Sequence, residues 1–198
     1  ICTPEYNASF PALLKNTPRP ADQKLVASMQ ETIGSLSVLL NDLLDLSKLE
    51  AGVVTPTVST FSVKEMFESL ASAHQPEATA KGLRLHYVTT PLTGRTDAVL
   101  FKRLLGNLLE NALRYTERGG VVIGCRRRQG KAWVEAWDSG IGIPDDRTTE
   151  IFEEFKQLGD QARNQGSGLG LAIVAKTASL LGLGISVRSR LGHGSVFA

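Results

Sequence analysis

The most regular pattern of apolar and polar positions lies between residues 21 and 50. Its apolar residues recur in steps of four and three, at Leu25, Met29, Ile33, Leu36, Leu40 and Leu43, and Leu39, Leu46 and Leu49 widen the stripe. This spacing predicts a long amphipathic helix whose apolar face needs partner helices. We therefore expect an irregular, proline-rich segment over 1–20, a dimerisation helix with its linker over 21–55, and a globular domain over 56–198.

The globular part mixes helical and strand patterns. Helices are predicted over 63–81, 98–115 and 169–181, and Asp97 is a good N-cap for the second of them. Strands are predicted over 83–88, 121–127, 132–137, 184–190 and 194–197. The last four strands form two neighbouring pairs that look antiparallel. The pattern predicts an α+β sandwich, in which a sheet is covered on one face by helices.

Composition narrows the classes of function. Of 198 residues, 42% are hydrophobic and 21% are charged, which fits a globular protein with a sizeable core. The formal charge of +2 argues against nucleic acid or an anionic membrane as the main partner. No apolar run approaches the length that crosses a bilayer, so any membrane attachment is expected outside this chain. Cys2 and Cys125 match no metal or disulfide spacing, which favours a reducing, cytoplasmic compartment.

The helix predicted over 98–115 carries a polar row among its leucines. Arg103, Asn107, Asn111, Arg114 and Tyr115 follow one another at spacings that place them on one stripe. A plain solvated face would carry lysine and glutamate instead of two asparagines. An asparagine carbonyl oxygen is a suitable ligand for a hard cation such as Mg²⁺, and arginine can neutralise phosphate oxygens. The row therefore indicates a phosphate site.

Three later segments support a nucleotide site. In "DSGIGIP", Asp138 follows a strand, and Gly140 and Gly142 let the backbone approach a flat ring closely. "IFEEF" places Phe152 and Phe155 three residues apart, which predicts that they share one helical face. In "GSGLGLAIV", residues 166–174, three glycines precede a helix, where backbone N–H groups can hold a polyphosphate. The segment lacks the ending of a P-loop and the context of a dinucleotide-binding fingerprint.

These segments, in this order, resemble the N box, first glycine box, F box and second glycine box of sensor histidine kinases. "LLNDLLDLSKLEAG" resembles the end of the second helix of their dimerisation and phosphoacceptor hairpin, and "GHGSVF" is similar to their closing strand motif. The resemblance covers roughly residues 22–198. It implies a Bergerat-type ATP-binding α/β sandwich, a mixed sheet covered by helices, preceded by a long helix of a dimeric helical bundle.

The resemblance also implies a ligand set, with ATP and Mg²⁺ as cofactors. Asn111 would coordinate Mg²⁺, Asn107 would line the same catalytic site, and Asp138 would accept a hydrogen bond from the adenine amino group. The other implied nucleotide contacts are Arg114, Tyr115, Gly140, Gly142, Ile143, Phe155, Arg163, Gly166, Gly168, Leu169 and Gly170. The implied partners are a second copy of the chain, through the helical bundle, and the receiver domain of a response regulator.

The histidines depart from the family pattern. Such kinases phosphorylate a histidine on the first helix of the hairpin, yet this chain has only His74, His86 and His193, none in the corresponding box. Either that helix lies outside these residues or the protein has no acceptor. The irregular residues 1–20 would be a remnant of the first helix. The leading hypothesis is a histidine kinase of a two-component system. The alternatives are a slow ATPase of the superfamily and a non-catalytic nucleotide-binding regulator.

Overall fold

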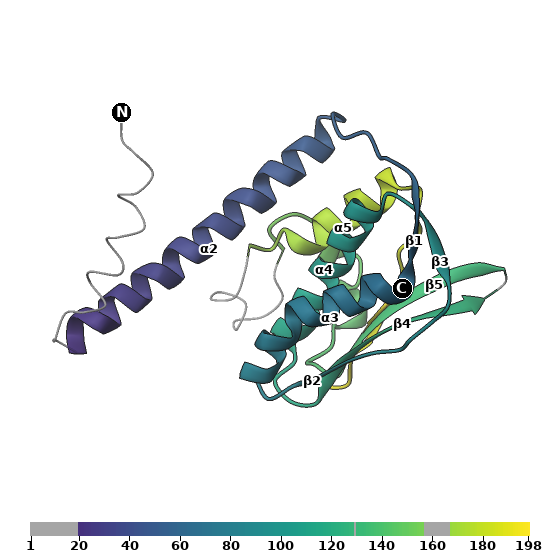
Figure 1. The fold of residues 1–198 in the computed structure, drawn as a ribbon. Helices are drawn as coiled ribbons and strands as arrows, with labels where there is room; N and C mark the ends of the chain where they lie inside the picture. Colours follow the sequence, from purple (N-terminus) through teal and green to yellow (C-terminus); the bar gives the residue numbers. More distant parts are fainter. Residues whose placement is uncertain (1–19, 129, 157–166) are drawn as a thin grey trace. The chain divides into compact units, whose positions relative to one another are not determined.

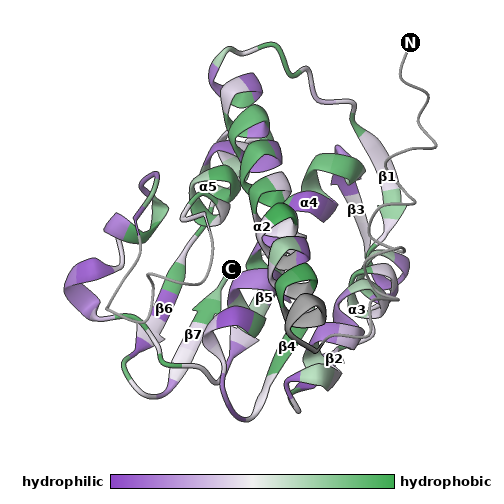
Figure 2. Cartoon of the chain, turned by 90° about the vertical axis from the view of Figure 1, so that its left-hand side faces the viewer, coloured by the Kyte–Doolittle hydropathy of each residue, from purple (hydrophilic) through white to green (hydrophobic). Residues whose placement is uncertain are grey.

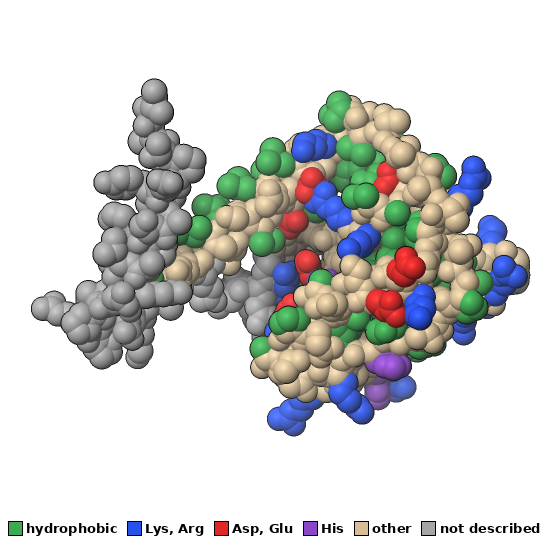
Figure 3. Space-filling view, in the orientation of Figure 1, with side chains coloured by type: hydrophobic (Ala, Val, Ile, Leu, Met, Phe, Trp, Pro, Cys, Tyr) green, Lys and Arg blue, Asp and Glu red, His purple; other side chains and the backbone are tan. Residues whose placement is uncertain are grey.

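The computed structural model describes residues 20–128, 130–156 and 167–198. The chain divides into two units, Ile1–Asn41 and Asp42–Ala198. Helix α2 (Pro20–Glu50) crosses this division. Its bounds confirm the long helix predicted from residue 21 to residue 50. Hydrophobic residues recur along α2 (Figure 2), and their side chains are visible on its surface (Figure 3). The exposed members of the predicted stripe include Leu25, Met29, Ile33, Leu36, Leu40 and Leu43.

The larger unit is built on a five-stranded mixed sheet with the order β2-β4-β5-β7-β6. Its strands are β2 (Arg84–Tyr87), β4 (Gly120–Arg128), β5 (Lys131–Asp138), β6 (Val187–Arg190) and β7 (Gly194–Phe197). The predicted antiparallel pairs, β4–β5 and β6–β7, are confirmed, and β5 pairs with β7 in the same sense. Strand β2 pairs with β4 in parallel, which makes the sheet mixed.

Three helices cover one face of this sheet (Figure 1). They are α3 (Val63–Ala80), α4 (Ala98–Tyr115) and α5 (Gly170–Leu180), close to their predicted bounds. Asp97 caps α4 as predicted, because its Oδ1 accepts hydrogen bonds from the amides of Val99 at 3.0 Å and Leu100 at 2.9 Å. Ser62 caps α3 in the same way, by accepting from the amide of Glu65.

Two small features were not predicted from the sequence. Strands β1 (Ser59–Ser62) and β3 (Thr93–Thr96) form a separate antiparallel pair. Two 3-10 turns, η1 (Asp145–Arg147) and η2 (Glu150–Phe152), occupy the segment after β5. Both features are too short to show a periodic pattern of apolar residues.

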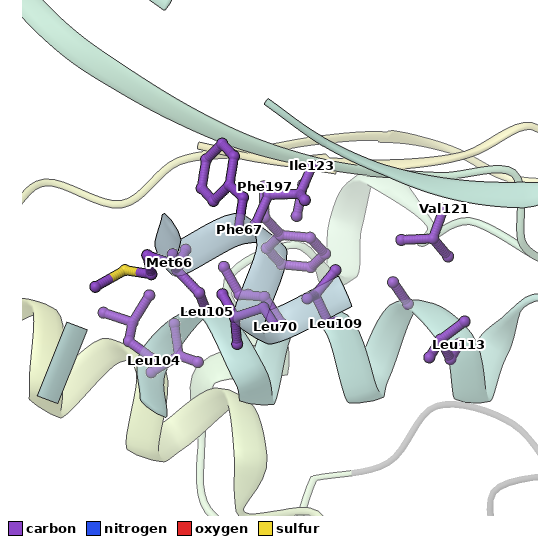
Figure 4. Packing of buried hydrophobic residues seen from close by; sticks show 14 of the residues in the cluster. Met66, Phe67, Leu70, Leu104, Leu105, Leu109, Leu113, Val121, Ile123 and Phe197 are labelled. Carbon is purple, nitrogen blue, oxygen red and sulfur yellow. The ribbon is translucent and has the colours of Figure 1, made fainter. Parts of the chain in front are cut away.

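The core lies between the helices and the inner face of the sheet (Figure 4). Leu109 and Leu113 of α4 and Phe67 of α3 have no exposed surface, and they pack against Val121 and Ile123 of β4. Burying a side chain of this size stabilises the fold by roughly 1.5–3 kcal/mol. This packing makes α4 a rigid support, and its polar stripe is held in a fixed orientation along the helix.

Candidate functional site

Asn111 of α4 lies against the beginning of α5. A methyl group built on Gly170, the first residue of α5, would lie 3.2 Å from Nδ2 of Asn111, so the two helices approach closely there. The Nδ2 atom of Asn107 is buried, and it has no hydrogen-bond partner among the described residues. A buried amide without a partner is costly, and a bound polar ligand or water would satisfy it.

Asp138 ends β5 at the base of the site. Its Oδ1 accepts hydrogen bonds from the amide of Gly140 at 2.9 Å and from the amide of Ser195 at 3.2 Å. Its Oδ2 accepts none from the described part of the chain. Burial raises the pKa of the Asp138 carboxyl group, and the two amide hydrogen bonds oppose this rise. The carboxyl group is therefore rigidly held, with one oxygen available to a ligand.

The loop that follows Asp138 requires its glycines. Gly142 has a φ of +70°, and a methyl group on it would lie 2.7 Å from the carbonyl carbon of Arg190. The amide of Ile141 donates to the carbonyl oxygen of Tyr115 at 3.2 Å, and the amide of Ile143 donates to Oγ of Ser189 at 2.7 Å. The loop is thus fastened to the end of α4 on one side and to β6 on the other.

These elements enclose a pocket between α4, the loop after β5 and the beginning of α5. Five predicted residues line it: Asn111, Tyr115, Asp138, Gly142 and Ile143. Seven residues that the sequence analysis did not single out complete the lining: Ala112, Ile141, Ile151, Lys156, Leu171, Ser195 and Phe197. Most of these residues are apolar and a few are polar, which is the usual composition of a small-molecule site.

The other predicted residues lie around this pocket without lining it. Asn107 lies one turn before Asn111, and Arg114 is half-buried near the end of α4. Gly140 belongs to the loop under the site, and Gly168 and Leu169 directly precede α5. Leu169 is fully buried, against Leu46 and Ile173. Arg163 and Gly166 fall outside the described residues.

The prediction that Phe152 and Phe155 share a helical face is wrong. Phe152 ends η2 and makes an edge-to-face contact with Phe197, with ring centroids 6.4 Å apart. Phe155 lies beyond that turn with a φ of +60°, and 61% of its surface is exposed. The 3-10 turn ends at Phe152 and Phe155 has a left-handed backbone conformation, so helical spacing does not apply between the two rings.

Lys156 and Ser195 are the informative residues that sequence reasoning missed. Lys156 follows the second phenylalanine of "IFEEF", and its cationic side chain lies at the pocket. Ser195 belongs to the closing "GHGSVF" strand, and its amide binds Asp138 across the sheet. The signal for Lys156 was its position directly after a recognised motif, whereas the role of Ser195 depends on a contact between distant segments.

The end of α2 that belongs to the larger unit contacts the same region. Asp42 accepts a hydrogen bond from Oγ of Ser167 at 2.8 Å, just before the glycine-rich start of α5. Leu46 is only 2% exposed, against Leu169 and Ile173. Lys176 of α5 pairs with Glu50 and, at 3.1 Å, with Glu154. The start of α5 is therefore held from two sides.

The donor set suits a nucleotide with a magnesium ion better than a protein-held metal. Among the described residues, no cluster of three or more His, Cys, Asp or Glu side chains could bind a metal ion. Mg²⁺ commonly takes one or two protein oxygens and completes its shell with phosphates and water. Asn111 supplies such an oxygen in the pocket.

In the described segments, no helix has the length and apolar character needed to cross a bilayer.

Comparison with known proteins places this fold in a family. Residues 96–198 match the model of the histidine kinase-, DNA gyrase B-, and HSP90-like ATPases. The sensor histidine kinase RcsC of Escherichia coli is 31% identical over 188 residues, which are 92% of this chain and 20% of RcsC. The chain thus spans about a fifth of the length of this relative.

Solved structures of histidine kinases have a similar fold. Full-length ShkA in complex with AMPPNP is 28% identical, with a TM-score of 0.78 over 99% of this chain and 45% of ShkA. Histidine kinase ThkA, crystallised with the response regulator protein TrrA, has a TM-score of 0.71 at 21% identity over 96% of this chain and 54% of that chain, which shows a common fold. The match over residues 96–198 shows that this chain belongs to the family of histidine kinase-, DNA gyrase B- and HSP90-like ATPases, and the mixed sheet and pocket agree with it.

Proposed function

We propose that this chain is the catalytic region of a Mg-ATP-dependent protein histidine kinase. It would transfer the γ-phosphoryl group of ATP to a histidine, from which the group passes to an aspartate of a response regulator. One observation carries the proposal: a single pocket has a held carboxylate, Asp138, at its base and the amide of Asn111 beside the start of α5. The name of RcsC as a sensor histidine kinase supports the same reaction.

Asp138 would select the base. Its free Oδ2 accepts a hydrogen bond from the exocyclic amino group of adenine, whereas the carbonyl oxygen of guanine at that position would be repelled. The apolar lining, including Ile141, Ile143 and Phe197, suits the faces of a flat ring. Tyr115 would lie along the nucleotide from the end of α4.

The phosphates would lie toward α5. Asn111 would hold Mg²⁺, which when bound neutralises phosphate charge, and the unpaired amide of Asn107 would donate to a phosphate oxygen or a water molecule. Arg114 and Lys156 would supply positive charge. The first amides of α5, reached through Gly168 and Gly170, point toward the same end, where a helix N-terminus favours an anion.

Transfer to a protein acceptor is favoured over hydrolysis by the residues around the metal site. A hydrolytic enzyme needs a general base to activate water, and Asn107 occupies the position where such a glutamate would stand. Glu110, the acidic residue of α4, does not line the pocket. We therefore expect slow ATP hydrolysis when no acceptor is present.

The acceptor histidine would come from a hairpin helix that these residues do not include. His74 lies on α3, His86 on β2 and His193 in the turn before β7, so none lies on α2. Dimerisation through the exposed stripe of α2 would build the helical bundle that presents the acceptor. Phosphoryl transfer depends on positioning, so histidines elsewhere on the surface are poor substitutes.

A cytoplasmic location fits the free thiol of Cys125.

The test is a labelling assay with ATP that carries a radioactive γ-phosphate. The chain alone should bind Mg-ATP without labelling itself, and addition of the hairpin that carries the family's acceptor histidine should produce acid-labile, base-stable label on that hairpin. An Asn111→Ala variant is the matched control and should lose the label. Robust labelling of His74, His86 or His193 would overturn the assignment of the acceptor. Rapid phosphate release without acceptor would favour the ATPase, and neither label nor release would favour a regulator.

A further inference from the structure

The second face of the five-stranded sheet carries an ordered set of side chains away from the helices. Inward residues such as Val121, Ile123 and Ala136 are buried, so their neighbours along each strand point to the opposite side. Strand pairing aligns His86, Val122, Trp137, Val196 and Arg188 in one row across all five strands. We call this side the outer face; it also includes the outward residues Val88, Arg126, Arg128, Trp133 and Glu135.

The centre of the outer face is packed. Glu135 is 6% exposed, and its carboxylate accepts from Nη2 of Arg126 at 2.5 Å and from Nε1 of Trp137 at 3.2 Å. The guanidinium group of Arg128 lies over the ring of Trp133, 5.6 Å from its centroid. These contacts hold both tryptophans in place, so a partner would lose little side-chain freedom on binding.

The centre also has accessible apolar surface. Trp137 is 43% exposed and Val88 is 48% exposed, and Val122 and Val196 flank the indole of Trp137 in the same row. Large exposed aromatic groups are uncommon on a surface without a partner, and tryptophan and arginine are the residues that contribute most to binding at interfaces.

Charge around this centre has one sign. The exposed basic residues on the outward side of the strands are Arg84, Arg126, Arg128, Lys131, Arg188 and Arg190. Glu135 is the acidic residue on that side of the strands, and Arg126 already neutralises it. Within the described residues, Arg84, Arg128, Lys131 and Arg188 form no ion pair. Figure 3 shows Lys and Arg side chains gathered at the edge where the β4–β5 hairpin ends in Figure 1.

We propose that the outer face docks an acidic amphipathic helix of a partner protein. A sheet readily takes helices on both faces, and here only one face is covered by helices of the described chain. The apolar side of the partner helix would lie over Val122, Trp137 and Val196. Its carboxylates would meet Arg188 at one end of the row and, on β2 at the other side of the sheet, Arg84. Charge complementarity of this kind gives orientation and a fast encounter.

Two other occupants fit less well. A second copy of this face would bring the same positive charges together, which opposes self-association. Single-stranded nucleic acid binds by stacking bases on open aromatic rings. Arg128 covers the ring of Trp133, so this ring is not open to a stacking base. The nucleotide pocket opens on the helical side of the sheet, so docking on the outer face would leave it free.

The chain provides its own reporter for a test, because its two tryptophans, Trp133 and Trp137, both lie on the outer face. The probe is a synthetic amphipathic helix with leucines on one side and glutamates on the other. The control is the same helix with lysines in place of the glutamates. Titration with the glutamate helix should shift the tryptophan emission at low salt, and raised salt should weaken the binding. A (dT) oligonucleotide serves as the nucleic-acid probe.

Charge-reversed variants complete the test. Arg84→Glu with Arg188→Glu should weaken binding of the glutamate helix by about tenfold or more. Lys64→Glu with Lys102→Glu makes the same change in charge on exposed positions of the helical layer and should leave binding unchanged. Urea unfolding of each variant verifies that it is folded. The proposal is overturned if the glutamate helix binds no more tightly than the lysine helix, if the oligonucleotide binds more tightly, or if the two double variants behave alike.

Discussion

Gly140 is the position where one added methyl group should disturb the nucleotide pocket most directly. A Cβ atom there would lie 2.9 Å from the carbonyl carbon of Tyr115 and 2.9 Å from Oδ1 of Asp138. Carbon atoms pack at about 3.5–4.0 Å, so the loop and the end of α4 would have to separate by about 0.6 Å or more. Since the neighbour is backbone, no side-chain rotation relieves the contact. The separation would strain the hydrogen bond from Ile141 to Tyr115 and the one from Gly140 to Asp138.

The expected cost follows from these contacts. Overpacking typically destabilises by about 1–3 kcal/mol, and a weakened hydrogen bond adds about 1 kcal/mol. Gly140→Ala should therefore lower the free energy of unfolding by about 2–4 kcal/mol. It should also weaken ATP binding at least about tenfold, which corresponds to about 1.4 kcal/mol, because Asp138 moves with the loop.

Gly184 is a matched control for the same substitution. Neither glycine has a positive φ, and a methyl group on Gly184 would meet no atom within 4 Å. Gly184→Ala should be neutral or should stabilise the fold by up to about 1 kcal/mol, through the unfolded state. Urea unfolding and calorimetric titration with ATP measure both effects. If the two variants unfold at the same urea concentration and bind ATP equally, the close approach at Gly140 does not constrain the pocket.

Three further predictions concern charge and assembly. Asp138→Asn should reduce the preference for ATP over GTP in competitive binding. It should also stabilise the ligand-free protein at neutral pH. The pKa of Asp138 is raised in the folded protein, so its ionisation costs stability as pH rises above the ordinary carboxyl pKa. An equal preference for ATP over GTP in parent and variant would refute the assignment of Asp138. Backbone hydrogen bonds, led by the one from Leu100, lower the pKa of Asp97, so its stabilisation is present above the ordinary carboxyl pKa and is lost as pH falls through the lowered value. Asp97→Ala should cost about 0.5–2 kcal/mol at neutral pH, whereas Asp97→Asn keeps the cap and loses the pH dependence; an acid unfolding profile of Asp97→Asn identical to that of the parent would contradict this. Ile33→Asp with Leu40→Asp should give monomers in sedimentation that still bind ATP, and a parent that is itself monomeric at all concentrations would count against dimerisation by α2.

The sequence alone was sufficient for features that depend on local chemistry. The bounds of α3, α4 and α5 followed from apolar periodicity, and the start of α4 followed from the capping chemistry of Asp97. The two hairpins followed from short apolar runs separated by turns. The placement of Asn111 and Tyr115 on one side of α4 followed from helical geometry, and the pocket includes both. Each of these inferences needs only residues that are close in sequence.

Tertiary structure decided whatever depends on distant segments meeting. Strand β2 pairs in parallel with β4 through a crossover connection that contains α4, and no local pattern in Arg84–Tyr87 encodes that partner. Ser195 reaches Asp138 across 57 positions of sequence, and Phe155 turns outward where a single 3-10 turn ends. Trp133, Glu135 and Trp137 form one cluster only after β4 supplies Arg126 from the neighbouring strand. Side-chain periodicity determines which face a residue occupies, but only the pairing of strands and the packing of helices determine what lies opposite it.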